Sequence, residues 1–478
     1  MLYSGRGFRE SEIGDIDVII KDGVYHLFHL ILPNHDYIAH ATSQDGINWE
    51  RTRNALFVGD PGSWDDDMLW TMHLVSQGDE YAMYYTGLSQ SEKGFYQRIG
   101  LATSPDLYQW EKQNHGKFPL EAAGPHYESP EHNVRQWVSF RDPYYVQHEG
   151  AEYLLFCARI ATGSISRRGC VGVAQIHEDS CELLPPLFIP YVYDDVECPC
   201  LFNKDGQFYL LGSIREDVKV HYWHSDNFVG PYQSFSNNVL MPEGNYAARV
   251  CEDGEHLLLY AFYVSHAENP ELAKRTLPPP KELVVGEDGC LVLKSFWRWR
   301  TMICDTLSAE KFPGFVPLLN NPTAEFVREK DEFRLRSVSG YEVQAMPQIS
   351  ENWIWEGEIK KAGVGKCGLV FNCDHKGNGY YISLDLLQGF VQVRSWGSNP
   401  DDIYKDYHYE NIQTNNFKTN KEQRHRFSLI RYDDYIELSI DGEVKLALVD
   451  DKYDGLYMGF YAETAEVILG EGRIFALG

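Results

Sequence analysis

Short apolar runs rich in aromatic residues recur along the first 290 residues and predict a repeating β structure. Most of them follow a turn that carries Gly or Asp, as in KDGVY and NKDGQFY, and helical periodicity is weak. The runs are YHLFHL at 25–30, YAMYYTG at 81–87, YLLFCAR at 153–159, FYLLGS at 208–213 and HLLLYAF at 256–262. Five such runs, each flanked by further short strands, indicate five structural repeats.

A second signature, a strand followed by a Ser/Asp turn and an aromatic residue, accompanies three of these repeats. Its copies are HATSQDGINWE at 40–50, LATSPDLYQWEK at 101–112 and the divergent HYWHSDNFVGPYQ at 221–233. Repeats of roughly 50–70 residues with about four short strands are typical of propeller blades. The sequence therefore predicts an all-β chain whose residues 1–295 form a five-bladed β-propeller.

The pattern changes after residue 295. Residues 296–330 lack the blade signature and are expected to be a connection, whereas residues 331–478 again alternate apolar and polar positions. The tight IDGEV turn near residue 441 is a strong hairpin signal. Many short strands without the blade signature predict a C-terminal β-sandwich.

Composition narrows the possible partners. The formal net charge of −27 disfavours nucleic acid and anionic membranes, and the aromatic content of 14% suits both β structure and sugar binding. Ten cysteines in 478 residues are too sparse for a disulfide scaffold, no His/Cys cluster predicts a zinc site, and the N-terminus lacks the apolar segment of a signal peptide. We expect a cytoplasmic protein that acts on a small carbohydrate without metal or cofactor. Its oligomeric state, including a homo-oligomer, stays open.

Three acidic residues lie at the entry to a strand in three of the repeats: Asp15, Asp142 and Glu197. Equivalent positions of a circular repeat converge on its axis, and acids brought together repel one another until their pKa values separate. Glycoside hydrolysis needs one protonated and one ionised carboxyl group. Asp15 alone also fits an ordinary turn, and Asp142 alone fits a structural pair with Arg141. The neighbouring acids Asp194 and Asp195 are expected in a solvated turn.

Arg-Asp-Pro at 141–143 and Glu-Cys-Pro at 197–199, set in this β pattern, resemble glycoside hydrolase family 32, the β-fructofuranosidases. The family's layout is a five-bladed propeller followed by a β-sandwich, so the resemblance spans nearly the whole chain. The sequence departs from the family's first motif, Trp-Met-Asn-Asp-Pro-Asn-Gly. Asp15 is the best match to its acid, with Ile16 in the place of Pro, and Asp17 is the competing assignment. The spacing of this first blade is closer to family 43, mostly arabinosidases and xylosidases, which invert configuration and lack Glu-Cys-Pro.

The resemblance to family 32 implies roles for individual residues. Asp15 is expected to be the nucleophile, Glu197 the acid/base and Asp142 a ligand of sugar hydroxyls that stabilises the transition state. Arg141 is expected to pair with one carboxylate, and Gln97 stands where the family has a substrate-contacting Gln. Four further residues at the starts of blades two and five are candidate sugar contacts, with packing as the alternative: Trp70, His73, Tyr246 and Arg249.

These observations predict a retaining hydrolase of small β-fructofuranosides. The first alternative is an inverting arabinofuranosidase or xylosidase of the family 43 kind, and the second is a non-catalytic carbohydrate-binding propeller. A glycoside phosphorylase is disfavoured because Arg141 and Arg249 are the only evident phosphate ligands. A retaining mechanism requires the nucleophile and the acid about 5–5.5 Å apart, and an inverting one roughly 6.5–9.5 Å.

Overall fold

The computed structural model describes residues 2–5, 12–113, 116–132, 134–265, 274–398, 407–420 and 422–478. It divides into two compact units, one made mainly of residues 2–264 and the other mainly of residues 292–478. Both are built of antiparallel strands, and the helices of the described residues are short 3₁₀ turns. In the part of the chain that the structure describes, no helix has the length and apolar character needed to span a bilayer.

The first unit contains five antiparallel sheets that follow one another along the chain, which confirms the predicted five-bladed propeller. Blade one holds β1 (Glu12–Lys21), β2 (Val24–Leu32), β3 (Tyr37–Ser43), β4 (Glu50–Arg51) and β5 (Leu56–Phe57). Blade two holds β6 (Met68–Gln77), β7 (Glu80–Leu88), β8 (Gln97–Ser104), β9 (Glu111–Lys112) and β10 (Leu120–Glu121). Blade three holds β11 (Phe140–His148), β12 (Ala151–Arg159), β13 (Gly169–Ile176) and β14 (Cys181–Phe188).

The last two blades repeat this order. Blade four holds β15 (Glu197–Lys204), β16 (Gln207–Ile214), β17 (Lys219–Ser225) and β18 (Val239–Met241). Blade five holds β19 (Asn245–Asp253), β20 (His256–Val264), β21 (Arg275–Thr276), β22 (Lys281–Val285) and β23 (Leu291–Ser295). Short 3₁₀ turns lie in the loops of this unit: η1 (Gln90–Glu92), η2 (Pro130–His132) and η3 (Ile165–Arg167).

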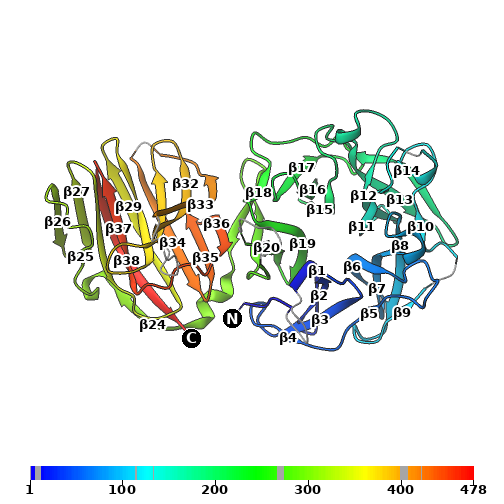
Figure 1. Ribbon diagram of the computed structural model, residues 1–478, viewed down its shortest axis with the longest axis horizontal. Coiled ribbons are helices and arrows are strands. Elements are labelled where there is room, and N and C mark those ends of the chain that lie inside the picture. Colours follow the sequence, from blue (N-terminus) through cyan, green and yellow to red (C-terminus); the bar gives the residue numbers. More distant parts are fainter. Residues whose placement is uncertain are drawn as a thin grey trace. The chain divides into compact units, whose positions relative to one another are not determined.

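The first strand of every blade faces the propeller axis, so β1, β6, β11, β15 and β19 form a ring (Figure 1). Consecutive members of this ring lie against each other, and β1 contacts β19 as well as β6, which closes it. Large apolar side chains fill the space between neighbouring blades, as Phe140, Phe156 and Tyr127 do around blade three. This packing fixes the inner strands and any side chain that they carry toward the axis.

The repeated Ser/Asp signature closes the third strand of its blade. In blade one Ser43 and Asp45 bond each other, and Asp45 accepts hydrogen bonds from the next backbone amides. Ser104 and Asp106 make the same turn in blade two. Side chains of this type stabilise turns by bonding their own backbone, which explains why the motif recurs.

Each inner strand carries a one-residue β-bulge near its start, at the same place in all five blades. The pairing register slips between Ile13 and Ile16 in β1 and between Trp70 and Met72 in β6. It slips in the same way between residues 141 and 144, 197 and 200, and 246 and 249 of the other three inner strands. A bulge re-aims side chains and ends regular pairing, so five of them create a ring of redirected residues at one end of the axis.

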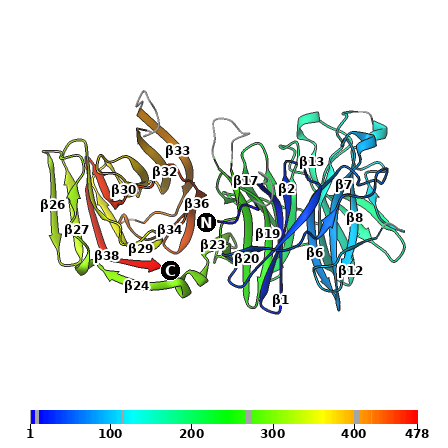
Figure 2. The same cartoon turned by 60° about the horizontal axis from the view of Figure 1, so that its bottom comes forward.

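The second unit is a β-sandwich, as predicted, made of two antiparallel sheets. One sheet contains β24 (Ile303–Ser308), β26 (Ala324–Glu329), β27 (Glu332–Ser337), β29 (Trp353–Ala362), β34 (Arg424–Tyr432), β35 (Tyr435–Ile440), β36 (Glu443–Val449) and β38 (Glu466–Leu477). The other contains β25 (Val316–Pro317), β28 (Tyr341–Pro347), β30 (Lys366–Cys373), β31 (Gly379–Asp385), β32 (Phe390–Ser398), β33 (Tyr407–Asn416) and β37 (Tyr457–Glu463). Figure 2 shows β30, β32 and β33 of the second sheet facing β29, β34 and β38 of the first.

Residues 296–330 were expected to be a connection, and the structure gives them more order than that. The turns η5 (Trp297–Met302) and η6 (Ala309–Lys311) lie here, and β24 pairs with β38 while β26 pairs with β27. Most of this segment therefore belongs to the sandwich.

Candidate active site

The three predicted acids meet at the ring of bulges. Counted back from the hairpin turn of each blade, Asp15 and Asp142 occupy the same position, two residues before Asp17 and Tyr144, whereas Glu197 lies three residues before Cys200 and directly precedes the bulge of β15. Asp142 adopts a left-handed backbone with φ of 61°, and Cys198 does the same at 49° in the neighbouring bulge. The expectation of equivalent positions therefore fits Asp15 and Asp142 and is wrong for Glu197, which lies one residue earlier in its strand.

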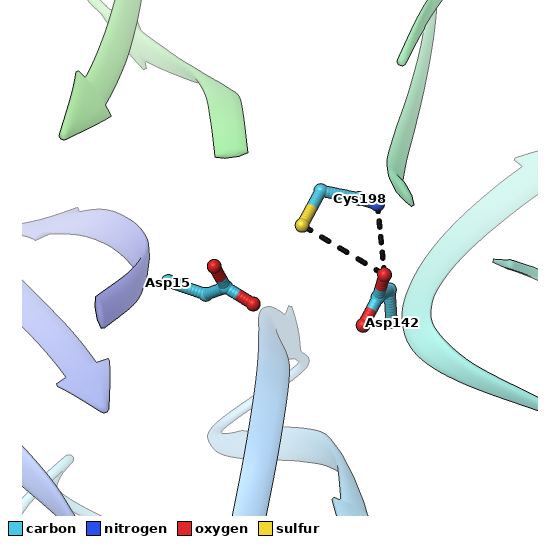
Figure 3. A group of neighbouring side chains, drawn as sticks. All are labelled: Asp15, Asp142 and Cys198. Carbon is cyan, nitrogen blue, oxygen red and sulfur yellow. Dashed lines mark hydrogen bonds between the residues drawn. The ribbon is translucent and has the colours of Figure 1, made fainter. Parts of the chain in front are cut away.

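Asp15, rather than Asp17, is the acid of β1 that faces the other acids. Figure 3 shows the side chain of Asp15 directed toward Asp142 and Cys198. The Thr71 hydroxyl from β6 donates a hydrogen bond to Asp15. Burial raises the pKa of Asp15 above its ordinary value, and the negative charge of Glu197 adds to this effect.

Asp17 has a different environment. It is 2% exposed, and its carboxylate accepts hydrogen bonds from the backbone amides of Val18 and Leu74 at 2.9 and 2.7 Å. His73 Nδ1 lies 2.8 Å from the same carboxylate. Since all these partners are structural, Asp17 joins β1 to β6 beneath the site.

Asp142 is fixed by the two neighbouring blades. Its backbone amide donates to Thr86 Oγ1 at 3.1 Å, and its carboxylate accepts from the amide of Cys198 at 2.9 Å (Figure 3). Arg141 Nε lies 3.6 Å from the same carboxylate. Burial raises the pKa of Asp142, and the Arg141 charge opposes that rise. The carboxyl group is thus held rigidly toward the axis, suited to binding sugar hydroxyls.

Glu197 lies between a cation and a phenol. Arg141 Nη2 is 2.5 Å from Glu197 Oε1, and the Tyr246 hydroxyl donates to Glu197 Oε2. Burial, with Glu197 close by, raises the pKa of the Tyr246 hydroxyl well above its ordinary value, so Tyr246 stays protonated and remains a donor. The Glu197 side chain is 14% exposed, which leaves it open to a ligand.

An arginine cluster that the sequence did not reveal surrounds Trp137. The guanidinium groups of Arg159, Arg141 and Arg215 lie 5.0, 5.2 and 5.7 Å from its ring centre. Asp195 pairs with Arg141 at 3.0 Å and with Arg159 at 2.9 Å, and it is 2% exposed.

The expected solvated turn at Asp194 and Asp195 is therefore wrong for Asp195. Burial opposes its ionisation, but Arg141 and Arg159 outweigh burial and hold the pKa of Asp195 below its ordinary value. The sequence did contain one signal for this pairing. Asp195 lies two residues before Glu197, and this spacing places both carboxylates on the side of Arg141.

A second layer of side chains closes the axis below the acids, with one residue from each inner strand: Asp17, His73, Tyr144, Cys200 and Arg249. His73 stacks on Tyr144 with ring centres 4.1 Å apart, and Arg249 lies 5.4 Å from the centre of the Tyr144 ring. Arg249 Nη1 donates to the carbonyls of Cys198 and Pro199 at 3.0 and 2.7 Å. His73 therefore supports the layer of acids from below, and Arg249 supports the bulge in β15.

The other two predicted contacts occupy different positions. Trp70 precedes the bulge of β6, as Glu197 does in β15, and its buried indole Nε1 has no hydrogen-bond partner among the described residues. Gln97 is 2% exposed, and its Oε1 accepts from the backbone amide of Phe140 at 2.9 Å. Gln97 therefore positions the start of β11 and through it Arg141 and Asp142.

Asp15, Asp142 and Cys198 form the one group of three possible metal ligands found among the described residues, with their ligand atoms within 4.8 Å of one another. Burial raises the pKa of the Cys198 thiol well above its usual value, and Asp15 and Asp142 add to the rise. A protonated thiol is a poor metal ligand. The chemistry of this donor set therefore fits acid chemistry better than metal binding.

Three carboxyl groups that converge on the axis of a five-bladed propeller place this chain in the class of glycosidase-type propeller proteins. The sequence profile described as glycosyl hydrolases family 43 matches residues 10–271, more than half of the chain. The chain therefore belongs to glycosyl hydrolases family 43. No curated protein sequence matches it.

Solved structures of similar fold extend over both units. Fructan 1-exohydrolase IIa from Cichorium intybus has a TM-score of 0.70 at 14% identity, with 100% of this chain and 97% of that chain covered. Exo-inulinase from Aspergillus awamori has 0.69 at 14%, covering 100% and 98%. The GH32 β-fructofuranosidase BmSUC1 from Bombyx mori has 0.66 at 16%, covering 97% and 91%. These likenesses show that the fold of both units is shared with these structures.

Proposed function

We propose that the protein hydrolyses small β-fructofuranosides by a retaining double displacement. The observation with most weight is the arrangement of the three acids. Glu197 lies between Arg141 and Tyr246, Asp142 is locked by the amide of Cys198, and Asp15 faces both across the axis. The two-unit fold supports the same reading, since it is similar over nearly its whole length to a solved β-fructofuranosidase, an exo-inulinase and a fructan 1-exohydrolase.

In this mechanism Asp15 attacks the anomeric carbon, and Glu197 protonates the departing oxygen. A covalent glycosyl ester forms on Asp15, and Glu197 then takes a proton from the water that hydrolyses it. Asp142 accepts hydrogen bonds from two sugar hydroxyls. The positive charge of the oxocarbenium-like transition state favours ionised Asp15, which lowers the cost that burial places on that carboxylate.

Arg141 and Tyr246 both donate hydrogen bonds to the carboxylate oxygens of Glu197, and these contacts occupy its buried side. A leaving-group oxygen that accepts a proton from Glu197 must therefore bind on the exposed side of this carboxyl group. Arg215, whose Nη1 lies 4.0 Å from Glu197 and whose side chain is 53% exposed, lies on that side and contacts the leaving group in our proposal.

The second candidate is inverting hydrolysis of arabinofuranosides or xylosides. The family 43 match over the propeller favours it, and so does Ile16, which stands where fructofuranosidases have Pro. In that case Asp15 activates a water and forms no covalent bond.

Product analysis separates the two candidates. The chain is incubated with sucrose, 1-kestose, inulin and levan beside aryl arabinofuranoside and aryl xyloside, as wild type and as Glu197→Ala. Release of fructose that the substitution abolishes supports the proposal. Cleavage of the pentosides alone, with an inverted anomer in the first NMR spectra, selects the second candidate.

We further propose a cytoplasmic location, supported by ten cysteines that are all free thiols.

A further inference from the structure

The β-sandwich contains a polar cavity of about 710 Å³ on its first sheet. Strands β29, β34, β35 and β38 and the turn η6 contribute to its lining, which includes Glu356, Arg426, Ser439, Glu471 and Arg473. A cavity of this size accommodates a ligand of two or three sugar rings. All of its lining residues belong to the second unit.

Glycines keep the floor of this cavity open. A Cβ atom at Gly357 would lie 3.0 Å from Phe427 Cε1, and one at Gly472 would lie 3.0 Å from Phe312 Cε2. Phe427 lines the cavity and is fixed from below by an edge-to-face contact with Trp355, with ring centres 5.4 Å apart. The missing side chains at Gly357 and Gly472 therefore avoid crowding the buried phenylalanines that support the cavity.

Ser439 adds an unsatisfied group. It is 4% exposed, lines the cavity, and its Oγ has no hydrogen-bond partner in the part of the chain that the structure describes. A buried hydroxyl without a partner costs free energy, so its presence requires a compensating contact. A ligand in the cavity supplies that contact.

The charges select the kind of ligand. Four carboxylates and two arginines line the cavity, so an anionic ligand is repelled by the net charge. Arg426 and Glu471 are exposed and 3.7 Å apart, too far for a close ion pair, and both keep hydrogen-bonding capacity. Among the described residues, no three possible metal ligands converge here. Alternating carboxylate acceptors and guanidinium donors match the hydroxyl groups of a neutral sugar.

We propose that this cavity is a second carbohydrate-binding site, which takes a neutral oligosaccharide. Sugar hydroxyls donate to Glu356 and Glu471 and accept from Arg426 and Arg473. Ser439 Oγ bonds a hydroxyl at the bottom. Such a site holds the enzyme on an oligomeric substrate or product, and it does not depend on which sugar the propeller cleaves.

The test is calorimetric titration of the full chain, carrying Glu197→Gln to prevent turnover, with 1-kestose, xylotetraose and arabinotetraose. At least one of these probes is expected to bind at two sites. Arg426→Ala with Arg473→Ala should weaken the second site at least tenfold. Ser439→Ala should weaken it as well without lowering the melting temperature, since the hydroxyl has no protein partner to lose. Arg334→Ala, an exposed arginine of the same sheet outside the cavity, is the matched control.

Loss of the second site in the cavity variants, with the control unchanged, supports the proposal. Binding at one site for all three probes overturns it, and so does a second site that survives both cavity variants. Hydrolysis of small substrates should be unaffected by Arg426→Ala, which separates this site from the propeller acids.

Discussion

Arg141 Nη2 lies 2.5 Å from Glu197 Oε1, and this contact joins blade three to blade four at the level of the acids. The same guanidinium group reaches Asp195 at 3.0 Å and Asp142 at 3.6 Å, so one cation serves three carboxylates. Because Arg141 is 3% exposed, little water screens these interactions. The acids can therefore be close without driving the blades apart.

Removing Arg141 should destabilise the propeller strongly. Arg141→Leu leaves the carboxylates of Asp142 and Glu197 without their close cation and leaves Asp195 with Arg159 alone, and breaking a buried pair costs about 3–5 kcal/mol. Chemical denaturation measures the loss. Arg215→Leu removes a guanidinium group whose side chain is 53% exposed, and it should change the free energy of unfolding by less than about 1 kcal/mol. Equal losses for the two variants would contradict this assignment of Arg141.

Glu197→Gln should leave the fold intact and lower kcat by roughly 10²–10⁴, the usual contribution of general acid–base catalysis. Substrates with activated aryl leaving groups should lose less, because they need little protonation. Steady-state kinetics with both substrate types measures the difference. Glu216→Gln, an exposed acid on the neighbouring loop, is the control and should keep full activity. An unchanged kcat in Glu197→Gln would remove this residue from the chemistry.

Much of this arrangement was accessible from the sequence, because its causes are local. Turn residues, alternating apolar positions and the Ser/Asp signature repeat in each blade, so they predict five blades and the three acids. The bulges were not accessible, since the pairing register is a property of two strands. The partners of Asp195 and the contact of Gln97 with Phe140 were missed for a similar reason, because they join residues that are distant in the sequence. Asp195 lies 36 positions from Arg159 and 54 from Arg141, and Gln97 lies 43 positions from Phe140.

The acid limb of the pH–activity profile should lie above the ordinary carboxylate pKa of about 4. Burial raises the pKa of Asp15, and a nucleophile must be ionised, so activity is lost as pH falls through that raised value. The Thr71 hydroxyl opposes the rise by donating to Asp15. Thr71→Val should therefore move the acid limb of kcat/KM to higher pH. Thr103→Val, in the third strand of the same blade, should leave it in place.

Asp15 and Asp17 should respond differently to substitution. Asp15→Asn removes the nucleophile, so it should abolish turnover and keep or raise the melting temperature, because a buried charge is lost. Asp17→Ala leaves the amides of Val18 and Leu74 without their acceptor and should destabilise the fold by about 2 kcal/mol or more. The reverse pattern would make Asp17 the nucleophile.

Buried histidines of blade one should make the protein acid-sensitive. Burial lowers the pKa of His29 and of His40 to about 3, whereas each titrates near 6.5 in the unfolded chain. The unfolded state thus binds more protons below pH 6.5, and stability falls as pH decreases from there toward 3. At pH 5 each histidine should account for a loss of about 2 kcal/mol relative to neutral pH.

His29 offers the sharper test, because its Nδ1 bonds the carbonyl of Leu30 at 2.8 Å and its Nε2 accepts from the Tyr3 hydroxyl at 2.8 Å. A neutral tautomer satisfies both contacts, with the Tyr3 hydroxyl as the donor of the second, and protonation forces that hydroxyl to accept instead. His29→Gln keeps a donor and an acceptor at this position but cannot titrate. The difference in unfolding free energy between pH 7 and pH 5 should therefore be smaller in His29→Gln than in the wild type. The control is His177→Gln, which removes an imidazole that is 43% exposed beside Glu182, and it should leave this difference unchanged. An equal difference in all three proteins would assign the acid sensitivity to residues other than His29.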